Sequence, residues 1–408
     1  MPTVTTEAIN HGERAHALLS ASGASRWMKC TPSARLEDPF PSKTSVHADE
    51  GTLAHEFADV ELKKSQNIIT EEAYQAKLTE LRDHDLYTDD MEEHVAVYTD
   101  FVQEQLASSR GGSLIIEEKV NFSTYVPDGY GTCDAIILPS ISNIPTQHPA
   151  ILFVTDLKYG KGVQVDAEDN PQLKLYALGA YLRYDLTHNI QIIRLTIVQP
   201  RLDHISTWDI SVEDLLKWAK EILKPLADKA YKGTGELCAG SHCRFCKVAP
   251  RCRALSEYSM AAARMDFADD EEPDSLLSDK EMVELYLQIP TIENWIKAVH
   301  TYMHDQAVKG KKYPGLKLVE GRSNRVWVNK EKVIDTLKDH IYSDKQIMIT
   351  KLAGIGVIEK LMGKVQFKQV LGELTVKPTG KASLVHESDK RPAIGLAQAK
   401  KDFEEPLD

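Results

Sequence analysis

The sequence contains no long apolar run. Although 42% of its 408 residues are hydrophobic, no stretch reaches the roughly 18 apolar residues that a membrane-spanning helix needs. The segment from Met1 to Arg14 also lacks the basic start and apolar stretch of a secretory signal. We therefore expect a cytoplasmic protein with no membrane-bound part, in which thiols stay reduced.

The chain also lacks a basic excess. Its formal net charge is -12, which argues against a protein that coats DNA through charge alone. A local basic groove and an acidic metal site are both compatible with that charge. The length allows two or three domains.

Cysteines are few and unevenly distributed. Of the six, Cys30 and Cys133 stand alone, and four lie within fifteen residues: Cys238, Cys243, Cys246 and Cys252. In a reducing compartment such crowding indicates a metal rather than disulfides. The chemistry of four thiolates leaves two arrangements open. One is a local zinc knuckle, with His242 as a substitute ligand; the other is an iron–sulfur cluster that recruits Cys30 and leaves Cys238 spare.

Hydrophobic periodicity and turn residues predict an α/β fold. Residues 1–110 are expected to be mainly helical, with Gly51 at the start of a helix over 52–64 and a second helix over about 91–106. Pro171 lies in the favoured first turn of a further helix, over 171–183. Strands are predicted over the ranges 114–120, 131–138, 151–157, 192–199 and 207–210. Together these elements describe a mixed sheet flanked by helices.

The C-terminal third is less informative. We expect one domain over residues 1–258, an acidic linker over 259–279, a smaller and mainly helical accessory domain over 280–375, and a flexible tail over 376–408. Basic residues at 309–312 and around Trp327 are interpreted as a solvated face rather than a catalytic site.

The strongest chemical signal is a pair of acids on neighbouring predicted strands. Asp134 ends the motif GTCD, and Asp156 and Lys158 form the motif DLK about twenty residues later. Because alternate strand residues share a face, Asp156 and Lys158 project together. Carboxylates bind the divalent cations that assist phosphodiester hydrolysis, and a lysine can orient or deprotonate the attacking water.

Residues on two predicted helices extend this pattern. His55 can complete a metal shell and favours manganese-like ions, although a helical histidine is more often structural. Gln172 and Tyr176 are four residues apart and share a helical face. They can donate hydrogen bonds to a phosphate, and the tyrosine can stack on a base. The alternative is that Tyr176 packs in the core beside Gln172.

The order of these motifs resembles the RecB-like nucleases of the PD-(D/E)xK superfamily, such as the CRISPR-associated RecB-like exonucleases. The resemblance rests on GTLAH ending at His55, GTCD, DLK and QLKLY, and covers about residues 14–255. The chain is also similar to the phage and prophage family DUF2800, through GYGTCDAIIL, HCRFC and ESDKRPAI. Thr155 stands where the superfamily name has proline.

The resemblance implies specific roles. His55, Asp134 and Asp156 would bind Mg²⁺ or Mn²⁺, Lys158 would assist the water, and Gln172 and Tyr176 would position DNA. Glu117 matches a weaker acidic position of the superfamily and would join the catalytic set, by binding a second metal or by supporting a metal ligand. Glu118 is its rival because only one of the two can face the site. A [4Fe-4S] cluster would be held by Cys30, Cys243, Cys246 and Cys252.

We therefore expect a deoxyribonuclease, and more specifically an exonuclease. The resemblance adds a place in phage recombination or DNA processing in a bacterial cell, with DNA and single-strand-binding or annealing proteins as partners. Two other interpretations stay open: a non-catalytic DNA-binding or assembly protein on a zinc-stabilised nuclease-like fold, and a metal-binding structural protein in which the acids are incidental.

Overall fold

The computed structural model describes residues 17–41, 45–109, 111–141, 149–263, 278–317, 332, 362–371 and 374. Two compact units divide the chain: Met1–Pro273 with Pro290–Asp305, and Asp274–Ile289 with Gln306–Asp408. The first unit contains the sheet and every site considered below.

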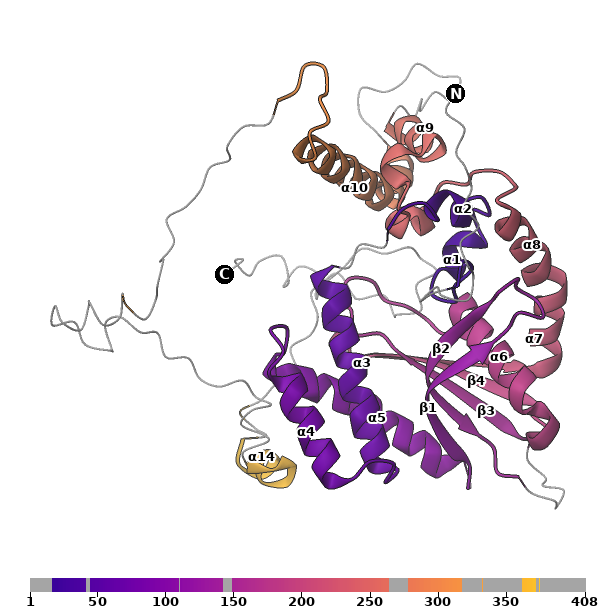
Figure 1. The fold of residues 1–408 in the computed structure, drawn as a ribbon, viewed down its shortest axis with the longest axis vertical. Helices are drawn as coiled ribbons and strands as arrows, with labels where there is room; N and C mark the ends of the chain where they lie inside the picture. Colours follow the sequence, from indigo (N-terminus) through magenta and orange to yellow (C-terminus); the bar gives the residue numbers. More distant parts are fainter. Residues whose placement is uncertain are drawn as a thin grey trace. The chain divides into compact units, whose positions relative to one another are not determined.

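The described elements of the sheet region follow the predicted order of helices, three strands, one helix and two strands (Figure 1). Up to the third strand they are α1 Ala24–Trp27, α2 Ser33–Glu37, α3 Val46–Ser65, α4 Glu71–Arg82, α5 Asp89–Ser108, β1 Ser113–Asn121, β2 Tyr130–Leu138 and β3 Ile151–Leu157. The rest of the first unit's core contains α6 Pro171–His188, β4 Ile192–Gln199, the 3₁₀ turn η2 Pro200–Leu202, β5 His204–Ser211, α7 Val212–Trp218, the π-helical turn η3 Ala219–Leu223 and α8 Lys224–Lys232. The cysteine region contains the 3₁₀ turns η4 Ser241–Phe245 and η5 Ala249–Arg251, followed by α9 Arg253–Ala263.

The sheet has five strands in the order β1-β2-β3-β4-β5. Only β3 and β4 pair in parallel, and α6 makes the crossover between them; the other pairs are antiparallel. This is the mixed sheet flanked by helices that the sequence predicts.

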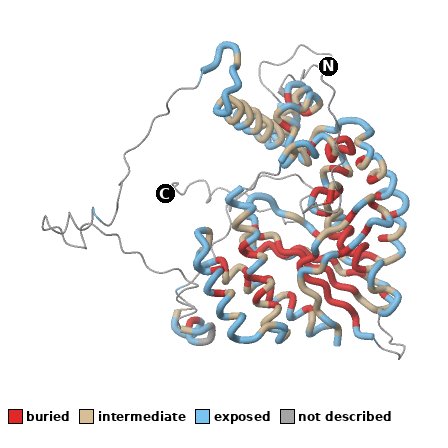
Figure 2. Tube along the Cα trace, viewed as in Figure 1, coloured by how far each residue is buried: buried red, intermediate tan, exposed pale blue. Residues whose placement is uncertain are grey.

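Helices cover both faces of the sheet, and the strands between them are the most buried part of the chain (Figure 2). On one face α3, α4 and α5 pack against Ala135, Ile137, Phe153 and Leu157. On the other face α1, α6 and the α7–α8 segment pack against alternate strand residues, including Ile136, Val154 and Leu195. The burial of this many apolar side chains, at roughly 25 cal/mol per Å² of apolar area, supplies the driving force that fixes the strand ends in place.

The predicted strands are confirmed, and those over 151–157 and 192–199 have the predicted bounds. The predicted start of the helix over 52–64 is wrong. That helix begins at Val46, because the Ser45 hydroxyl accepts a hydrogen bond from the Ala48 N–H and caps it. Gly51 therefore lies inside the helix and not at its start.

The second unit contributes α14 Lys364–Leu371 and the two ends of α10 Asp279–Val308. Helix α9 extends into the range 259–279 that was expected to be a linker, and residues 264–277 lie outside the described residues. So do the segment around Trp327 and the expected tail. No helix among the described residues is long and apolar enough to cross a membrane.

Candidate metal centre and cysteine pocket

The two predicted acids lie where β2 and β3 separate. Their pairing runs from Ile137 opposite Phe153 to Ala135 opposite Thr155, so the next positions are Asp134 and Asp156. There Oδ2 of Asp134 accepts the Leu157 N–H at 2.7 Å. A carboxylate thus takes the place of a backbone carbonyl at the point where the ladder opens.

On its other side, Asp134 faces a break in the β1–β2 ladder. Ile116 pairs with Ala135 and Glu118 with Cys133, but Glu117 between them is left out. Glu117 has φ 51°, in the left-handed region that costs a non-glycine residue about 1–2 kcal/mol. Strain of this kind is concentrated at functional sites, and here it accompanies a second carboxylate at the position opposite Asp134.

Helix α3 supplies the third member of the group. The Nδ1 atom of His55 lies 3.4 Å from Oδ1 of Asp134. Ligand atoms of His55, Glu117 and Asp134 all lie within 4.8 Å of one another. Ligands about 2.1 Å from an octahedral cation are about 3–4 Å apart, so two carboxylates and one imidazole at this spacing suit Mg²⁺ or Mn²⁺.

The structure alters the expected ligand set. Glu117, expected as an auxiliary acid, is in the closely spaced group, and Asp156 is not. Asp156 lies close enough for its charge to act on His55, but its carboxylate is held by Lys158 and Gln172. Glu118, the rival of Glu117, is not in the closely spaced group, and its carboxylate pairs with Arg183 at 2.5 Å.

The charges in this group are strongly coupled. Burial alone would lower the pKa of His55, but the carboxylates of Asp134, Asp156 and Glu117 outweigh it and raise that pKa to about 9. Loss of hydration, followed by repulsion from Asp134, raises the pKa of Glu117 to about 7. Without a cation, the site therefore holds protons that a metal must displace.

We expect Mn²⁺ to bind more tightly as the pH rises from about 6 to about 9. Each displaced proton contributes up to about tenfold in affinity per pH unit. In the metal-free protein the free energy of unfolding changes with pH in the opposite direction. Both groups have a raised pKa in the folded state, so the stability that they contribute at low pH is lost as the pH rises through about 7 for Glu117 and about 9 for His55. The Mn²⁺-induced increase in Tm should therefore grow with pH. An increase that is constant or shrinks over this interval would contradict the assignment of these ligands.

A hydrogen-bonded network holds the second acid beside the lysine. The Nζ atom of Lys158 lies 2.8 Å from Oδ2 of Asp156. Gln172 joins them, accepting from Lys158 Nζ and donating to Asp156 Oδ1, each at 3.0 Å. Its amide also donates to the Tyr176 hydroxyl at 3.0 Å. Asn170 caps α6 and accepts the N–H groups of Gln172 and Leu173, which fixes the helix start that carries the amide.

This network limits what each side chain can do. Burial would lower the pKa of Lys158, but the adjacent Asp156 raises it, so the amine stays charged at neutral pH and can orient a water rather than remove its proton. Tyr176 is 6% exposed, which leaves no open face for stacking on a base. Gly131 makes its position possible, since a Cβ there would lie 2.8 Å from the tyrosine ring.

One residue near the acids escaped the sequence analysis. Tyr98 on α5 is 1% exposed, and its hydroxyl has no hydrogen-bond partner among the described residues. Burial first, and then the charge of Asp134, raises its pKa. The spacing of Met91, Val95, Tyr98 and Val102 on one helical face predicts its burial, but nothing in the sequence connects it to the site.

The second predicted site is a pocket of cysteines. Helix α2 and the preceding turn bring Cys30 next to the four cysteines of residues 238–252. All five candidate ligands therefore line one cavity: Cys30, Cys238, Cys243, Cys246 and Cys252. Loss of hydration, with Glu37 nearby, raises the pKa of the Cys246 thiol to about 12. Cys133 lies apart, fully buried in the core.

The spacing of the sulfur atoms bears on the choice of metal. Four thiolates about 2.3 Å from one zinc ion are about 3.8 Å apart. Among the described residues, no three cysteine sulfurs lie within 4.8 Å of one another. The sulfur atoms therefore do not lie at zinc spacing around one point, and either metal would have to draw them together.

Glu37 fastens the cysteine loop to α2. It is 7% exposed, pairs with Arg26 Nε at 2.8 Å and accepts the Lys247 N–H at 2.6 Å. We expect Glu37→Ala to lower the free energy of unfolding by roughly 1–3 kcal/mol, because it leaves the half-buried Arg26 guanidinium and the Lys247 N–H without their carboxylate partner. Urea unfolding measures this change. Glu257→Ala, which breaks the exposed pair with Arg253, is the control and should cost less than about 1 kcal/mol. Equal effects would rule out a fastening role.

Comparison with known proteins establishes the family. The family model described as "Protein of unknown function (DUF2800)" matches residues 16–392, so the chain belongs to the DUF2800 family. The solved structure titled "Crystal structure of SSO0001" is similar, with 14% identity over 58% of this chain and 85% of that chain. Its TM-score of 0.26 is too low to support a conclusion about fold or function.

Proposed function

We propose that the protein is a metal-dependent deoxyribonuclease of the RecB-like, PD-(D/E)xK type. One observation carries the proposal: an imidazole and two carboxylates with donor atoms within 4.8 Å lie beside the buried Asp156, which is paired with the half-buried Lys158. Phosphodiester hydrolysis needs a cation site next to a group that holds water, and this arrangement offers both. Exonuclease action in phage recombination or DNA processing is part of the proposal and rests on the family resemblance.

The chain's residues would divide the work. His55, Glu117 and Asp134 would hold Mg²⁺ or Mn²⁺, which supplies charge neutralisation at the phosphate and a more acidic bound water. Asp156 is placed to contribute a further oxygen or to orient Lys158. The charged Lys158 amine would donate hydrogen bonds to the attacking water or to a phosphate oxygen, while Gln172 keeps it in position.

Gln172 and Tyr176 would position Asp156, rather than contact DNA directly as the sequence predicts. Their polar atoms are engaged with each other and with Asp156, so their contribution to DNA binding would pass through the acid they position. Removing the Gln172 amide would loosen two contacts on the catalytic pair rather than one contact with DNA.

The cysteine pocket supports a structural [4Fe-4S] cluster as part of the same proposal. Cys30 precedes the sheet and the triplet Cys243, Cys246 and Cys252 follows it, so a cluster would join both ends of the nuclease fold. Cys238 lines the same cavity and is the alternative ligand. Zinc is the other metal that thiolates could hold.

The test incubates purified protein with linear, nicked and circular DNA, with Mn²⁺, with Mg²⁺ and with a chelator. We expect cleavage of linear DNA with either metal and none with the chelator. Asp156→Ala and Lys158→Ala run beside the wild type. Cleavage that survives in both variants would show that the activity comes from elsewhere.

A further inference from the structure

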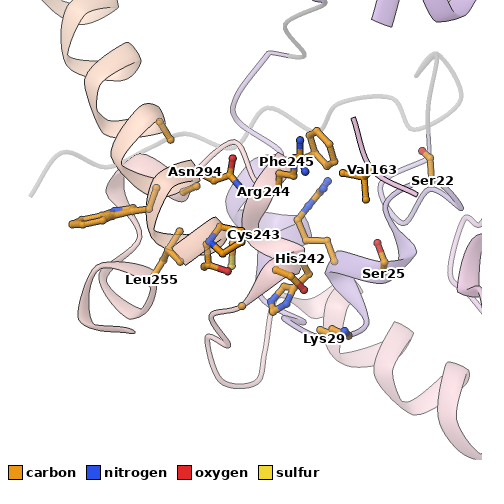
Figure 3. A pocket seen from close by; sticks show the side chains of 18 residues that line it. Ser22, Ser25, Lys29, Val163, His242, Cys243, Arg244, Phe245, Leu255 and Asn294 are labelled. Carbon is orange, nitrogen blue, oxygen red and sulfur yellow. The ribbon is translucent and has the colours of Figure 1, made fainter. Parts of the chain in front are cut away.

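A cavity of about 350 Å³ lies next to the cysteine pocket and is not used by the proposed chemistry. Its wall combines α1, the turn η4, the loop after β3 and residues 290–298 of α10, which belong to the same compact unit (Figure 3). Small-molecule sites are commonly about 300–1,000 Å³, so the cavity can hold one nucleotide but not a duplex.

The cavity contains cations that the rest of the described chain does not neutralise. Lys29 and Arg244 line it, and neither forms an ion pair with another described residue. Arg26, also in the wall, is by contrast paired with Glu37. Cations in a hollow with no acidic partner in the described part of the chain favour an anionic ligand, and in a chain of net charge -12 they are a local exception.

An exposed aromatic ring lies beside these cations. Phe245 is 73% exposed, and the Arg244 guanidinium lies 5.5 Å from the centre of its ring. Figure 3 shows both side chains next to Val163. A solvent-exposed phenylalanine next to a phosphate-binding arginine is the combination that binds single-stranded nucleic acids, where the ring stacks on a base and the cation meets the backbone.

The loop after β3 connects this cavity to the candidate metal centre. A Cβ at Gly162 would lie 3.7 Å from Arg244, so the loop passes close to the guanidinium. The buried Gln199 amide holds the loop by donating to the Val163 carbonyl at 2.9 Å and accepting the Val165 N–H at 2.6 Å. Val163 is five residues from Lys158, which limits the distance between their Cα atoms to about 17 Å.

We propose that this cavity binds one nucleotide of a single DNA strand, and that a phosphodiester a few nucleotides along the same strand lies at the metal centre. Arg244 and Lys29 contact the phosphate, and Phe245 stacks on the base. The inference rests on the proposed nuclease function and extends it, because it makes single-stranded DNA the substrate and places one nucleotide a few units from the bond that is cut.

The experiment measures binding without cleavage. Fluorescence anisotropy follows a fluorescein-labelled oligothymidylate on the Asp156→Ala protein in the presence of Ca²⁺. Adding Arg244→Ala or Phe245→Ala should weaken binding by about 5- to 100-fold each, the range expected for losing one stacked base or one phosphate contact. Arg253→Ala and Tyr258→Ala, on the adjacent helix α9 and outside the cavity wall, are the matched controls and should bind as the parent does. Unlabelled dTMP should compete with the oligomer.

Each outcome decides one of the two proposals. Unchanged binding in both cavity variants, or duplex DNA binding as tightly with the same dependence on Arg244 and Phe245, overturns the inference. If the wild type cleaves DNA while the cavity variants bind normally, only the inference fails. If no metal supports cleavage but oligothymidylate binding depends on both residues, the cavity assignment stands and the nuclease proposal fails. Thermal unfolding of each variant establishes that these exposed substitutions leave the fold intact.

Discussion

Asp134→Asn is expected to reduce Mn²⁺-dependent DNA cleavage by about 10³-fold or more. The substitution keeps the shape of the side chain and an oxygen that can still accept the Leu157 N–H, so the junction between β2 and β3 should survive. It removes the negative charge of Asp134, which is one of the three members of the closely spaced group and the ion-pair partner of His55. Initial rates over a Mn²⁺ titration measure the effect, with both the rate and the metal affinity expected to fall.

Asp209→Asn provides the matched control. This aspartate is also on a strand and also forms an ion pair, with both Nε and Nη2 of Arg194 at 2.8 Å, but it lies on the exposed surface of β4 and β5. Its loss should leave the cleavage rate within about twofold and cost less than about 1 kcal/mol of stability. If Asp134→Asn cleaves as Asp209→Asn does, the group around His55 is not the catalytic centre.

Cys30→Ser should have the largest effect on stability and should abolish binding of the cluster. Cys30 and Cys243 enclose more than two hundred residues, and a cross-link over such a loop restricts the unfolded chain by about 5 kcal/mol on the loop-entropy scale used for disulfides. The measured loss should be smaller than this figure. Two hydrogen bonds join the same regions without any metal, from the Thr31 hydroxyl to the Thr234 carbonyl and from Arg35 to the Tyr231 carbonyl.

Cys238→Ser separates the two candidate metals. It should leave a brown anaerobic preparation and its broad visible absorption unchanged, whereas Cys30→Ser should bleach them. A colourless wild type with one equivalent of zinc, lost in Cys238→Ser and retained in Cys30→Ser, would overturn the iron–sulfur assignment in favour of a local zinc knuckle.

The sheet could be predicted from the sequence because its strands are short apolar runs between turn residues. Ile151–Leu157 and Ile192–Gln199 are almost wholly buried, and a run that is apolar on both faces has few other places in a fold. The start of α3 could not be predicted in the same way. Residues 46–51 include no buried side chain and show no apolar period, so only the Ser45 cap fixes that end.

The candidate site could likewise be predicted only in part. The spacing of Asp156 and Lys158 on one strand, and of Gln172 and Tyr176 on one helical turn, predicts contacts that the structure contains. The resemblance points to Glu117 as an acidic position, but the left-handed backbone that places it beside His55 and Asp134 has no signature in a run of β-forming residues. Glu37 and Tyr98 likewise matter through partners or neighbours that are distant in the chain.

The central claim is that His55, Glu117 and Asp134 form a cation site beside Asp156 and Lys158, and crystals soaked in Mn²⁺ test it most directly. An anomalous difference map should show a manganese peak about 2.1–2.2 Å from the His55 imidazole and from oxygens of Glu117 and Asp134. The account is contradicted if the manganese binds elsewhere, or if the site stays free of metal above pH 8 with the His55–Asp134 contact intact.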